Sequence, residues 1–377
     1  MKSKESFALK YRPRVMDDLI GQEHIIKQIT GMIAKQEIVQ TMLLTGPSGI
    51  GKTTLARLIA RYVNCLDLDV KKMRPCGACF SCKRSSPSDT HEMNMAESRG
   101  IDDVRDLISK ASYAPQTNLR VFILDEMHQI TPQAQQALLK PLEEPPSQTI
   151  WILCTTNPEK FPETILQRCR IFQFKPLDSD MCVGLLKRVC EKEGASIGDE
   201  HLASIASLAQ NAPRRALKAL ESVIDYCNSA PVSKKELSKL IPDIVKTVIQ
   251  IPPIKSVARY LFGVYNGKYS QALLSLESVT SEPDYFLHLV IEHHRAVMYR
   301  QFSDKLHAIV KPDYNLFFKE MDLLEYQFDT SPRPMADAVV EMVSTASQLK
   351  QYTVDAKFLM LALTARIVSL FGKGASK

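Results

Sequence analysis

No stretch of apolar residues in this chain of 377 residues is long enough to cross a bilayer. The first apolar residues alternate with basic ones, so a continuous apolar signal-peptide region is also missing; the basic residues are Lys2, Lys4, Lys10, Arg12 and Arg14. Internal repeats, low-complexity tracts and an acidic or proline-rich tail are absent too. We therefore expect a soluble, intracellular protein.

The sequence also lacks a strong charge of either sign. Its net charge of +6 is mild, which permits contact with nucleic acid without implying it. A hydrophobic content of 45% allows full cores, and a charged content of 24% is ordinary. The length favours two or three domains. Composition alone therefore leaves the function open, and the motifs must decide it.

The most informative motif is Gly-Pro-Ser-Gly-Ile-Gly-Lys-Thr at residues 46–53, which fits G-x-x-x-x-G-K-[ST]. Residues 42–44 predict the end of a buried strand, and residues 55–63 predict a helix, so the flanks are right for a phosphate loop rather than an ordinary glycine-rich turn. Lys52 supplies charge for the terminal phosphates, and Thr53 offers a hydroxyl to Mg²⁺. We expect a nucleoside triphosphate to contact Gly46, Pro47, Ser48, Gly49, Ile50, Gly51, Lys52, Thr53 and Thr54.

Nine cysteines are many for a chain of this kind, and four of them cluster in sequence as Cys65, Cys76, Cys79 and Cys82. Four thiolates close a tetrahedral Zn²⁺ site, and two C-x-x-C spacings favour such a site. A disulfide interpretation needs an oxidising compartment, of which there is no sign. We predict structural zinc, because no ligand position is left open for catalysis. The other cysteines are expected to be buried thiols, namely Cys154, Cys169, Cys182, Cys190 and Cys227.

A hydrophobic segment at 120–126 predicts a strand that ends in two carboxylates, Asp125 and Glu126. In a P-loop fold the strand beside the loop ends at the phosphates. Asp125 is then placed to hold Mg²⁺ through water, and Glu126 to polarise the attacking water. The pair lies about 70 residues after the phosphate loop, which strengthens this interpretation.

Two further segments allow two interpretations each. The N-terminal segment 7–22 looks extended around Pro13, and it either holds a base beside the phosphate loop or packs as a simple arm. Ser98, Arg99 and Gly100 lie at the expected start of a helix. They either bind a phosphate of DNA or RNA or belong to a capped surface helix.

The later basic residues are similarly open. Polar residues that end the expected strand 149–156 are placed to sense a γ-phosphate. Arg168 lies at the end of an expected helix. It either reaches the ATP of a neighbouring subunit or is an ordinary surface arginine. Arg214 and Arg215 occupy the first turn of a helix, where cations are unfavourable, so either a phosphate or solvation accounts for them.

The remaining pattern predicts helices. Thr131 should cap a helix over 131–144 that Pro141 disturbs in its last turn. After a boundary at 175–177 the chain reads as short helices and then, from about 243, as wholly helical. His293 and His294 are consecutive on one helix and therefore make a poor metal pair.

With these residues in view, the chain resembles the gamma/tau subunit of the bacterial DNA polymerase III clamp loader, an AAA+ ATPase. The resemblance covers essentially the full length, and the cysteine insertion directly after the P-loop helix is its most specific feature. The other motifs that carry it are Tyr11-Arg-Pro with Ile20-Gly-Gln-Glu-His, the P-loop, Tyr113-Ala-Pro, Leu124-Asp-Glu-Met-His, Ala137-Leu-Leu-Lys-Pro-Leu-Glu-Glu-Pro-Pro, Thr155-Thr-Asn-Pro and Ile165-Leu-Gln-Arg-Cys.

The resemblance implies an α/β P-loop AAA+ domain over 1–177, with a parallel sheet flanked by helices and a zinc knob at 65–82. A helical lid domain over 178–242 and an all-α oligomerising collar over 243–377 would follow. The resemblance implies that the adenine is bordered by Tyr11, Arg12, Pro13, Ile20 and Gly21. It implies that Asp125 and Glu126 are the Walker B pair and that Thr156 or Asn157 is sensor 1. Arg168 would be the arginine finger and Arg214 would be sensor 2.

The implied function is that of a DNA- and clamp-stimulated ATPase that opens a sliding clamp and places it on primer–template DNA. The implied cofactors are ATP, Mg²⁺ and structural Zn²⁺, and the implied partners are the clamp, DNA at residues 98–100, and other subunits of a pentameric ring. We expect a cytoplasmic protein of a bacterial cell or an infected host, in the short form without the tau-type extension.

Two rival functions are a different AAA+ machine, such as a branch-migration motor or protein remodeller, and a non-hydrolysing scaffold subunit. The collar-like helical end, which lacks a winged-helix strand pattern, argues against the first. Lys52, Thr53, Asp125 and Glu126 are all present, which argues against the second.

Three positions and one segment depart from the family pattern. Gln167 stands where serine is usual before the finger, and Pro141 replaces a helix-compatible residue. Asn211 stands where glycine is usual, which leaves the choice between Arg214 and Arg215 open. The segment 98–102 is closer to the eukaryotic replication-factor pattern. A divergent or virus-encoded relative fits these departures.

Overall fold

The computed structural model describes residues 5–83, 89–209, 211–229, 254–277, 283–302, 321, 332–351 and 356–372. The chain divides into two compact units, Met1–Ile249 and Gln250–Lys377, and each is described by itself. Helical periodicity in the sequence also predicts helices over 233–240, 243–249 and 315–327. All of these residues except Met321 lie outside the described ranges, as does the expected lid–collar boundary at 242/243.

The first unit is built on a five-stranded sheet in the order β2-β3-β4-β1-β5, with every neighbouring pair parallel. Its strands are β1 Thr41–Thr45, β2 Thr90–Asn94, β3 Arg120–Asp125, β4 Thr149–Thr155 and β5 Arg170–Gln173. The expected parallel sheet is therefore confirmed. Because all the strands run the same way, their carboxyl ends meet at one edge of the sheet.

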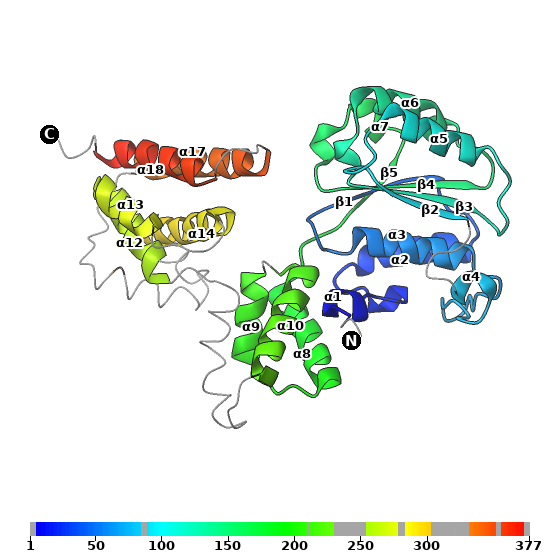
Figure 1. Ribbon diagram of the computed structural model, residues 1–377, viewed down its shortest axis with the longest axis horizontal. Coiled ribbons are helices and arrows are strands. Elements are labelled where there is room, and N and C mark those ends of the chain that lie inside the picture. The colour runs from blue at the N-terminus through cyan, green and yellow to red at the C-terminus, as the bar shows by residue number, and fades with distance from the viewer. Residues whose placement is uncertain are drawn as a thin grey trace. The chain divides into compact units, whose positions relative to one another are not determined.

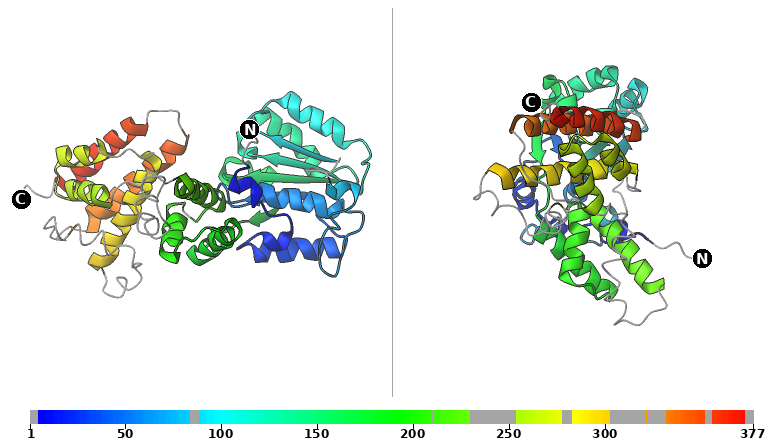
Figure 2. Two further views of the ribbon diagram at one scale, coloured as in Figure 1. Left: turned by 60° about the horizontal axis from the view of Figure 1, so that its bottom comes forward. Right: turned by 90° about the vertical axis from the view of Figure 1, so that its left-hand side faces the viewer.

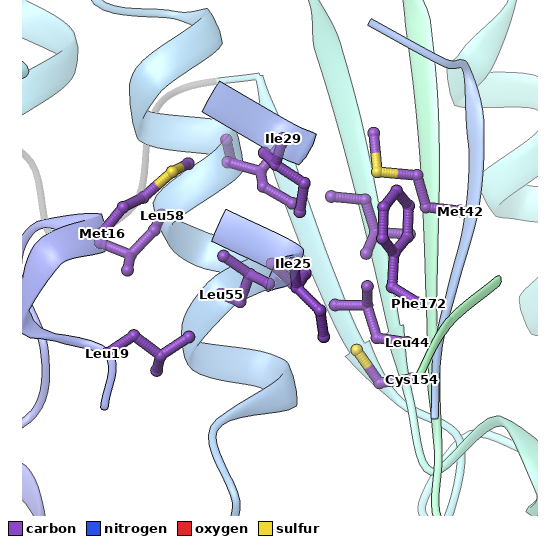
Figure 3. Close-up of a cluster of buried hydrophobic side chains, with 14 of the residues drawn as sticks. Met16, Leu19, Ile25, Ile29, Met42, Leu44, Leu55, Leu58, Cys154 and Phe172 are labelled. Atoms are coloured by element: carbon purple, nitrogen blue, oxygen red, sulfur yellow. The ribbon is translucent and has the colours of Figure 1, made fainter. Parts of the chain in front are cut away.

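Helices cover both faces of this sheet, as a parallel sheet requires (Figures 1 and 2). On one face lie α2 Glu23–Ala34 and α3 Lys52–Val63, and on the other lie α5 Ile101–Ala111 and α6 Pro132–Glu143. Figure 3 shows Ile25 and Ile29 of α2 between α3 and the strand side chains of Leu44 and Phe172. Burying each such aliphatic side chain contributes about 1.5–3 kcal/mol. This packing orients α3, and hence the phosphate loop before it.

The N-terminal segment is not extended, contrary to the prediction. It forms a short helix, α1 Phe7–Lys10, and a 3₁₀ turn, η1 Met16–Asp18. The Phe7 side chain is buried, and its backbone N–H donates to Glu221 Oε2 at 3.0 Å. These tertiary contacts fold a segment whose local sequence, interrupted by Pro13, shows no helical periodicity.

The helix α6 begins as predicted and ends differently. Thr131 caps it, with Oγ1 accepting the N–H of Ala134 at 3.3 Å. Pro141 lies inside the helix, which continues to Glu143 instead of being disturbed. Since Pro141 is in the last turn, its missing N–H removes only one hydrogen bond there. The buried side chains of Leu138 and Leu142 hold that turn on the sheet.

Three helices complete the described part of the first unit: α8 Ser179–Glu193, α9 Asp199–Leu208 and α10 Pro213–Ser229. They pack through buried apolar residues such as Leu186, Ile205 and Leu220. The shorter elements are α4 Phe80–Lys83, η2 Met127–Gln129, η3 Pro158–Lys160 and α7 Glu163–Leu166. The helix α1 lies against α10, so the N-terminal segment is connected to this helical group.

Within its described residues the second unit is wholly helical (Figure 1). Its helices are α12 Ile254–Tyr265, α13 Tyr269–Glu277, α14 Pro283–Phe302, α17 Pro332–Gln351 and α18 Ala356–Gly372. They share one apolar core that includes Tyr260, Phe286 and Leu363. Over the described ranges, every helix falls short of the length and apolarity needed to cross a membrane.

His293 and His294 serve the packing of the second unit. Both ring nitrogens of the buried His294 have partners, with Nδ1 2.6 Å from the Tyr265 hydroxyl and Nε2 3.0 Å from the Met335 carbonyl oxygen. Burial lowers the pKa of His294. His293 Nδ1 lies 2.7 Å from the carbonyl oxygen of Leu289. These contacts agree with the prediction that the two histidines are not a metal pair.

Candidate nucleotide-binding site

A cavity of about 630 Å³ lies at the carboxyl edge of the sheet, within the size range of small-molecule sites. Its wall is formed by the N-terminal segment, the phosphate loop with the start of α3, the middle of β2, the end of β3, Leu185 of α8 and the start of α10. The predicted residues that line it are Tyr11, Arg12, Pro13, Ile20, Ser48, Gly49, Ile50, Gly51, Lys52, Thr53, Thr54, Asp125, Glu126 and Arg214.

The phosphate loop joins β1 to α3 through backbone conformations that favour glycine. Gly51 caps α3 with φ +112° and Gly49 has φ +75°. A Cβ added at Gly49 would lie 3.1 Å from Cβ of Arg214, so glycine there lets α10 approach the loop closely. The sequence at 46–53 thus brings the start of α10, which is far away in the chain, to the cavity.

Lys52 is buried at the centre of this loop, with 6% of its surface exposed. Its Nζ donates to the carbonyl oxygens of Gly46 at 2.8 Å and Pro47 at 2.9 Å. Burial lowers the pKa of Lys52, while Glu126 and Asp125 act in the opposite direction. Its ammonium group therefore has weak neutral partners that a phosphate would replace favourably.

Thr53 and Asp125 form the contact that joins the loop to β3. The Thr53 hydroxyl donates to Asp125 Oδ2 at 2.6 Å, and the other oxygen, Oδ1, accepts the N–H of Glu126 at 2.9 Å. Hydroxyl and carboxylate oxygens are hard ligands of the kind that Mg²⁺ prefers, alongside water and phosphate oxygens. The residues present therefore fit a magnesium ion.

Glu126 follows with a left-handed backbone, φ +51°, which is uncommon for a residue other than glycine. This conformation turns the chain out of β3 into η2, and the Glu126 side chain lines the cavity. Asp125 and Glu126 therefore face the same cavity from adjacent positions, with different partners.

Four charged residues of the cavity wall were missed by sequence reasoning, namely Asp18, Arg57, Glu92 and Lys218. Arg57 of α3 donates to Glu92 of β2 through Nε at 2.5 Å and Nη2 at 2.6 Å. The signal for Arg57 was its position four residues after Thr53, on the same helix face. Glu92 had no local signal, because only the pairing of β2 with β3 brings it to this edge.

Arg12 connects the N-terminal segment to the phosphate loop. Its Nε donates to Thr54 Oγ1 at 3.1 Å. Burial and then the charge of Arg57 lower the pKa of Arg12. On the other side of the segment, the Tyr11 hydroxyl and the Lys10 ammonium both donate to Glu193 Oε1 at the end of α8, at 2.5 and 2.6 Å. The segment therefore spans from the loop to the helical group.

Other predicted residues do not line this cavity: Gly21, Gly46, Pro47, Thr156, Asn157, Arg168 and Arg215 are not among the described lining residues. Gly21 has φ +74°, and a Cβ there would lie 2.3 Å from Cδ2 of Leu177. Its role in this structure is thus close packing. Arg214, not Arg215, lies in the cavity wall.

The candidate sensor residues lie just beyond β4, at the same edge of the sheet. The Thr156 hydroxyl donates to Asn157 Oδ1 at 2.7 Å, and the Asn157 side chain donates to Glu159 at 2.8 Å. The backbone N–H of Asn157 donates to Thr155 Oγ1 at 3.1 Å. This network orders the polar groups of residues 155–157 outside the cavity lining.

Arg168 follows α7 and points to a different group. Its guanidinium donates to Glu143 Oε2 from Nε at 3.0 Å and Nη2 at 2.6 Å, and Nη1 donates to the Thr164 carbonyl at 2.7 Å. The pair is half-exposed, with 26% and 58% of the two side chains accessible. Arg168 is therefore bonded to residues of its own chain and does not line the cavity of that chain.

The residues proposed to contact DNA lie at the start of α5. Gly100 is the N-cap of this helix, and its N–H donates to Asp103 Oδ2 at 3.3 Å. The exposed Arg99 donates from Nε to the Ala96 carbonyl at 2.8 Å. Ser98 is half-buried beside them. The start of α5 is therefore capped, which agrees with the interpretation of residues 98–100 as part of a capped surface helix.

The four clustered cysteines come together in space. All four Sγ atoms of Cys65, Cys76, Cys79 and Cys82 lie within 4.8 Å of one another. A tetrahedral zinc with 2.3 Å bonds needs sulfur separations of about 3.8 Å, and the Cys65 and Cys82 sulfurs are 3.6 Å apart. Two sulfurs also accept backbone N–H groups, at Cys65 and Cys76. The residues present therefore fit a zinc ion.

The ionisation of these thiols is uneven. Burial opposes ionisation of Cys79, but hydrogen bonds from backbone N–H groups outweigh it and lower its pKa to about 6. Burial raises the pKa of Cys82 to about 12. Metal binding requires all four as thiolates, so uptake of zinc would release protons.

Metal analysis of the purified chain is expected to find about one zinc per chain, because four closely placed thiolates form a closed site. The double variant Cys76→Ser/Cys79→Ser should lose the metal and melt at a lower temperature. Cys227→Ser, which changes a thiol on α10, should keep the metal. Purified chain without zinc would contradict the assignment.

Comparison with known proteins adds to this geometry. Residues 21–178 match the family described as DNA polymerase III, delta subunit. The chain is 37% identical over 239 residues to DNA polymerase III subunit tau of Bacillus subtilis, covering 62% of this chain and 42% of that protein. It is 32% identical over 247 residues to DNA polymerase III subunit gamma of Buchnera aphidicola, covering 64% and 67%.

Coverage differs among these relatives. For DNA polymerase III subunit gamma/tau of Mycoplasma pneumoniae the identity is 35% over 231 residues, with 61% of this chain and 34% of that protein covered. The chain thus spans less than half the length of the first relatives, tau of B. subtilis included. Two mutant forms of RuvB from Thermotoga maritima superpose with a TM-score of 0.50 at 18% identity, covering 74% of this chain and 91% of those chains. This likeness shows a shared fold alone.

Proposed function

The chain belongs to the gamma/tau family of DNA polymerase III subunits, and from this premise we propose that it is an ATPase subunit of a sliding-clamp loader in DNA replication. One observation carries the ATPase part of the proposal. Lys52, the bonded pair Thr53–Asp125, and Glu126 all line one cavity of about 630 Å³. A phosphate-binding cation, a magnesium-binding pair and a further carboxylate are the groups that phosphoryl transfer to water requires.

In this proposal the loop residues bind and orient the triphosphate. Lys52 exchanges the carbonyl oxygens of Gly46 and Pro47 for phosphate oxygens, which are stronger acceptors. Thr53 and Asp125 hold Mg²⁺, which when bound neutralises charge on the phosphate oxygens. Glu126 orients and polarises the attacking water. Hydrolysis then depends on positioning and charge rather than on a covalent intermediate.

The base would lie against the N-terminal segment. Four of the residues assigned to the adenine border line the cavity, which supports that assignment: Tyr11, Arg12, Pro13 and Ile20. Gly21 instead allows close packing against Leu177. Arg214 of α10 is the better candidate for sensor 2, because it reaches the cavity wall. A nucleotide would then contact the loop, the segment and α10 at once, which would couple its presence to the orientation of a lid over 178–242.

Assembly and partners complete the proposal. Residues 243–377 would form the collar of a pentameric ring with other clamp-loader subunits. Arg168 would act on the ATP of the next subunit, with Thr156 or Asn157 as sensor 1. Primer–template DNA would contact Ser98, Arg99 and Gly100 mainly through phosphates. Zinc at residues 65–82 would be structural, and a cytoplasmic location would follow from the role in replication.

The test of this function is an ATPase assay on the assembled complex, with and without primed DNA and candidate sliding clamps. Because DNA and clamp would both stabilise the hydrolysis-competent ring, stimulation by the two together is the expected result. ATP hydrolysis that responds to neither would favour another AAA+ activity. The absence of ATP binding and hydrolysis would reject the proposal.

A further inference from the structure

His128 lies in η2, two residues after Glu126. Its side chain is almost fully enclosed, with 7% exposed. Its Nδ1 atom lies 3.4 Å from Oε2 of Glu126 and 3.2 Å from Oγ1 of Thr155 at the end of β4. One ring nitrogen is therefore shared between the proposed water-polarising carboxylate and the neighbouring strand.

The other ring nitrogen fixes the position of the proton. Nε2 of His128 lies 3.0 Å from Nε2 of Gln129. An amide nitrogen only donates, so Nε2 of the ring accepts and the ring proton is on Nδ1. Burial lowers the pKa of His128 more than the Glu126 charge raises it, so the ring is neutral near pH 7. The Nδ1–H group consequently donates to Thr155 Oγ1, with the Glu126 carboxylate 3.4 Å away on the same side of the ring.

Thr155 extends this contact to the candidate sensor segment. Its Oγ1 accepts the backbone N–H of Asn157 at 3.1 Å. Thr155 is also paired in register with Thr45, the last residue before the phosphate loop. A side-chain path therefore runs from Glu126 through His128 to the end of β4.

We propose that His128 is a positioning residue that holds the Glu126 carboxylate and makes its placement depend on residues 155–157. The inference rests on the proposed ATPase function. Glu126 has an uncommon backbone conformation, φ +51°, and an incompletely buried side chain, so its backbone alone leaves the carboxylate rotamers open. The imidazole of His128, with Nδ1 3.4 Å from Oε2, restricts these rotamers.

The test compares two substitutions of His128. His128→Leu removes the donor while keeping an apolar side chain of similar reach, and should lower kcat by about tenfold to a hundredfold, since a small displacement of a reacting group has such effects. The Kd for ATP should stay within about twofold, because phosphate and base contacts are untouched. His128→Asn can place an amide N–H where Nδ1–H lies, and should restore most of kcat.

A double variant separates positioning from general structural damage. If His128 acts through Glu126, then His128→Leu in a Glu126→Gln background should cause no further loss of kcat. His91→Leu is the matched control: it removes another neutral, half-buried imidazole, stacked on Phe122 and outside the cavity lining, and should leave kcat unchanged. Melting curves report whether each variant folds.

Several results would overturn the inference: unchanged or raised kcat in His128→Leu, an equal loss in His128→Asn, or a further loss in the double variant. Should His128→Leu fail to fold, Thr155→Val removes the second partner of Nδ1 and should lower kcat with the Kd unchanged; unchanged kcat would equally overturn it. A wild-type complex without ATPase activity would instead reject the proposed function.

Discussion

Replacing Glu126 with glutamine is expected to preserve ATP binding and to slow hydrolysis by about 10²-fold or more, the usual contribution of a positioned base. Glutamine has the same shape, so its side-chain oxygen can keep the position 3.4 Å from Nδ1 of His128. It lacks the negative charge that polarises water. The Thr53–Asp125 contact at 2.6 Å and Lys52 are unaffected, which is why binding should persist.

The measurement pairs equilibrium binding of a fluorescent ATP analogue with single-turnover phosphate release in the assembled complex. Glu97→Gln serves as the control, because Glu97 is an exposed carboxylate that accepts a hydrogen bond from Asn94 and does not line the cavity. Near-normal turnover in Glu126→Gln would remove Glu126 from the base role. Loss of binding would point to structural damage instead.

Replacing Arg168 with alanine is expected to reduce hydrolysis by about 10³-fold in the assembled complex and to leave ATP binding by the isolated chain unchanged. In its own chain Arg168 is bonded to Glu143 and to the Thr164 carbonyl, and it does not line the described cavity. A half-exposed ion pair contributes at most about 1 kcal/mol. Transfer of the guanidinium to a phosphate of a neighbouring subunit would therefore cost little.

Arg170→Ala is the matched control for this prediction. Arg170 is exposed, lies two residues further along, and has Gln28 and Met32 of α2 as partners instead of Glu143. It should leave hydrolysis unchanged. An equal loss in the isolated chain and in the complex after Arg168→Ala would contradict action on a neighbouring subunit, and so would full activity in the complex.

The regular elements were largely predictable because their signals are local. The helix α2, Glu23–Ala34, carries such a signal, since its buried residues Ile25, Ile29 and Ile33 recur at helical spacing. Continuous apolar runs predicted β1, β3 and β4 within a residue at each end. The prediction of an extended N-terminal segment was wrong, because its helix α1 depends on the burial of Phe7, which is a tertiary contact.

The site was predictable to the same extent. A P-loop places its phosphate-binding groups through a contiguous stretch of backbone, so residues 48–54 were identified by spacing alone. Asp125 and Glu126 were identified because a strand end is readable in sequence. The sequence did not identify the pair Arg57–Glu92 or the pair His128–Thr155. Their members are 35 and 27 residues apart in the chain, and only the tertiary fold brings them together.

By itself the sequence determined which groups are available for chemistry: a glycine-rich loop with its lysine and threonine, an acidic pair after a strand, and four thiols at metal-ligand spacing. These depend on short-range backbone geometry, which a few neighbouring residues control. Only the tertiary structure decided which charges face the cavity, that Arg214 and not Arg215 reaches it, and that Arg168 points away to Glu143. The physical reason is that such placements follow from strand order and helix packing, where distant segments meet through burial rather than through local pattern.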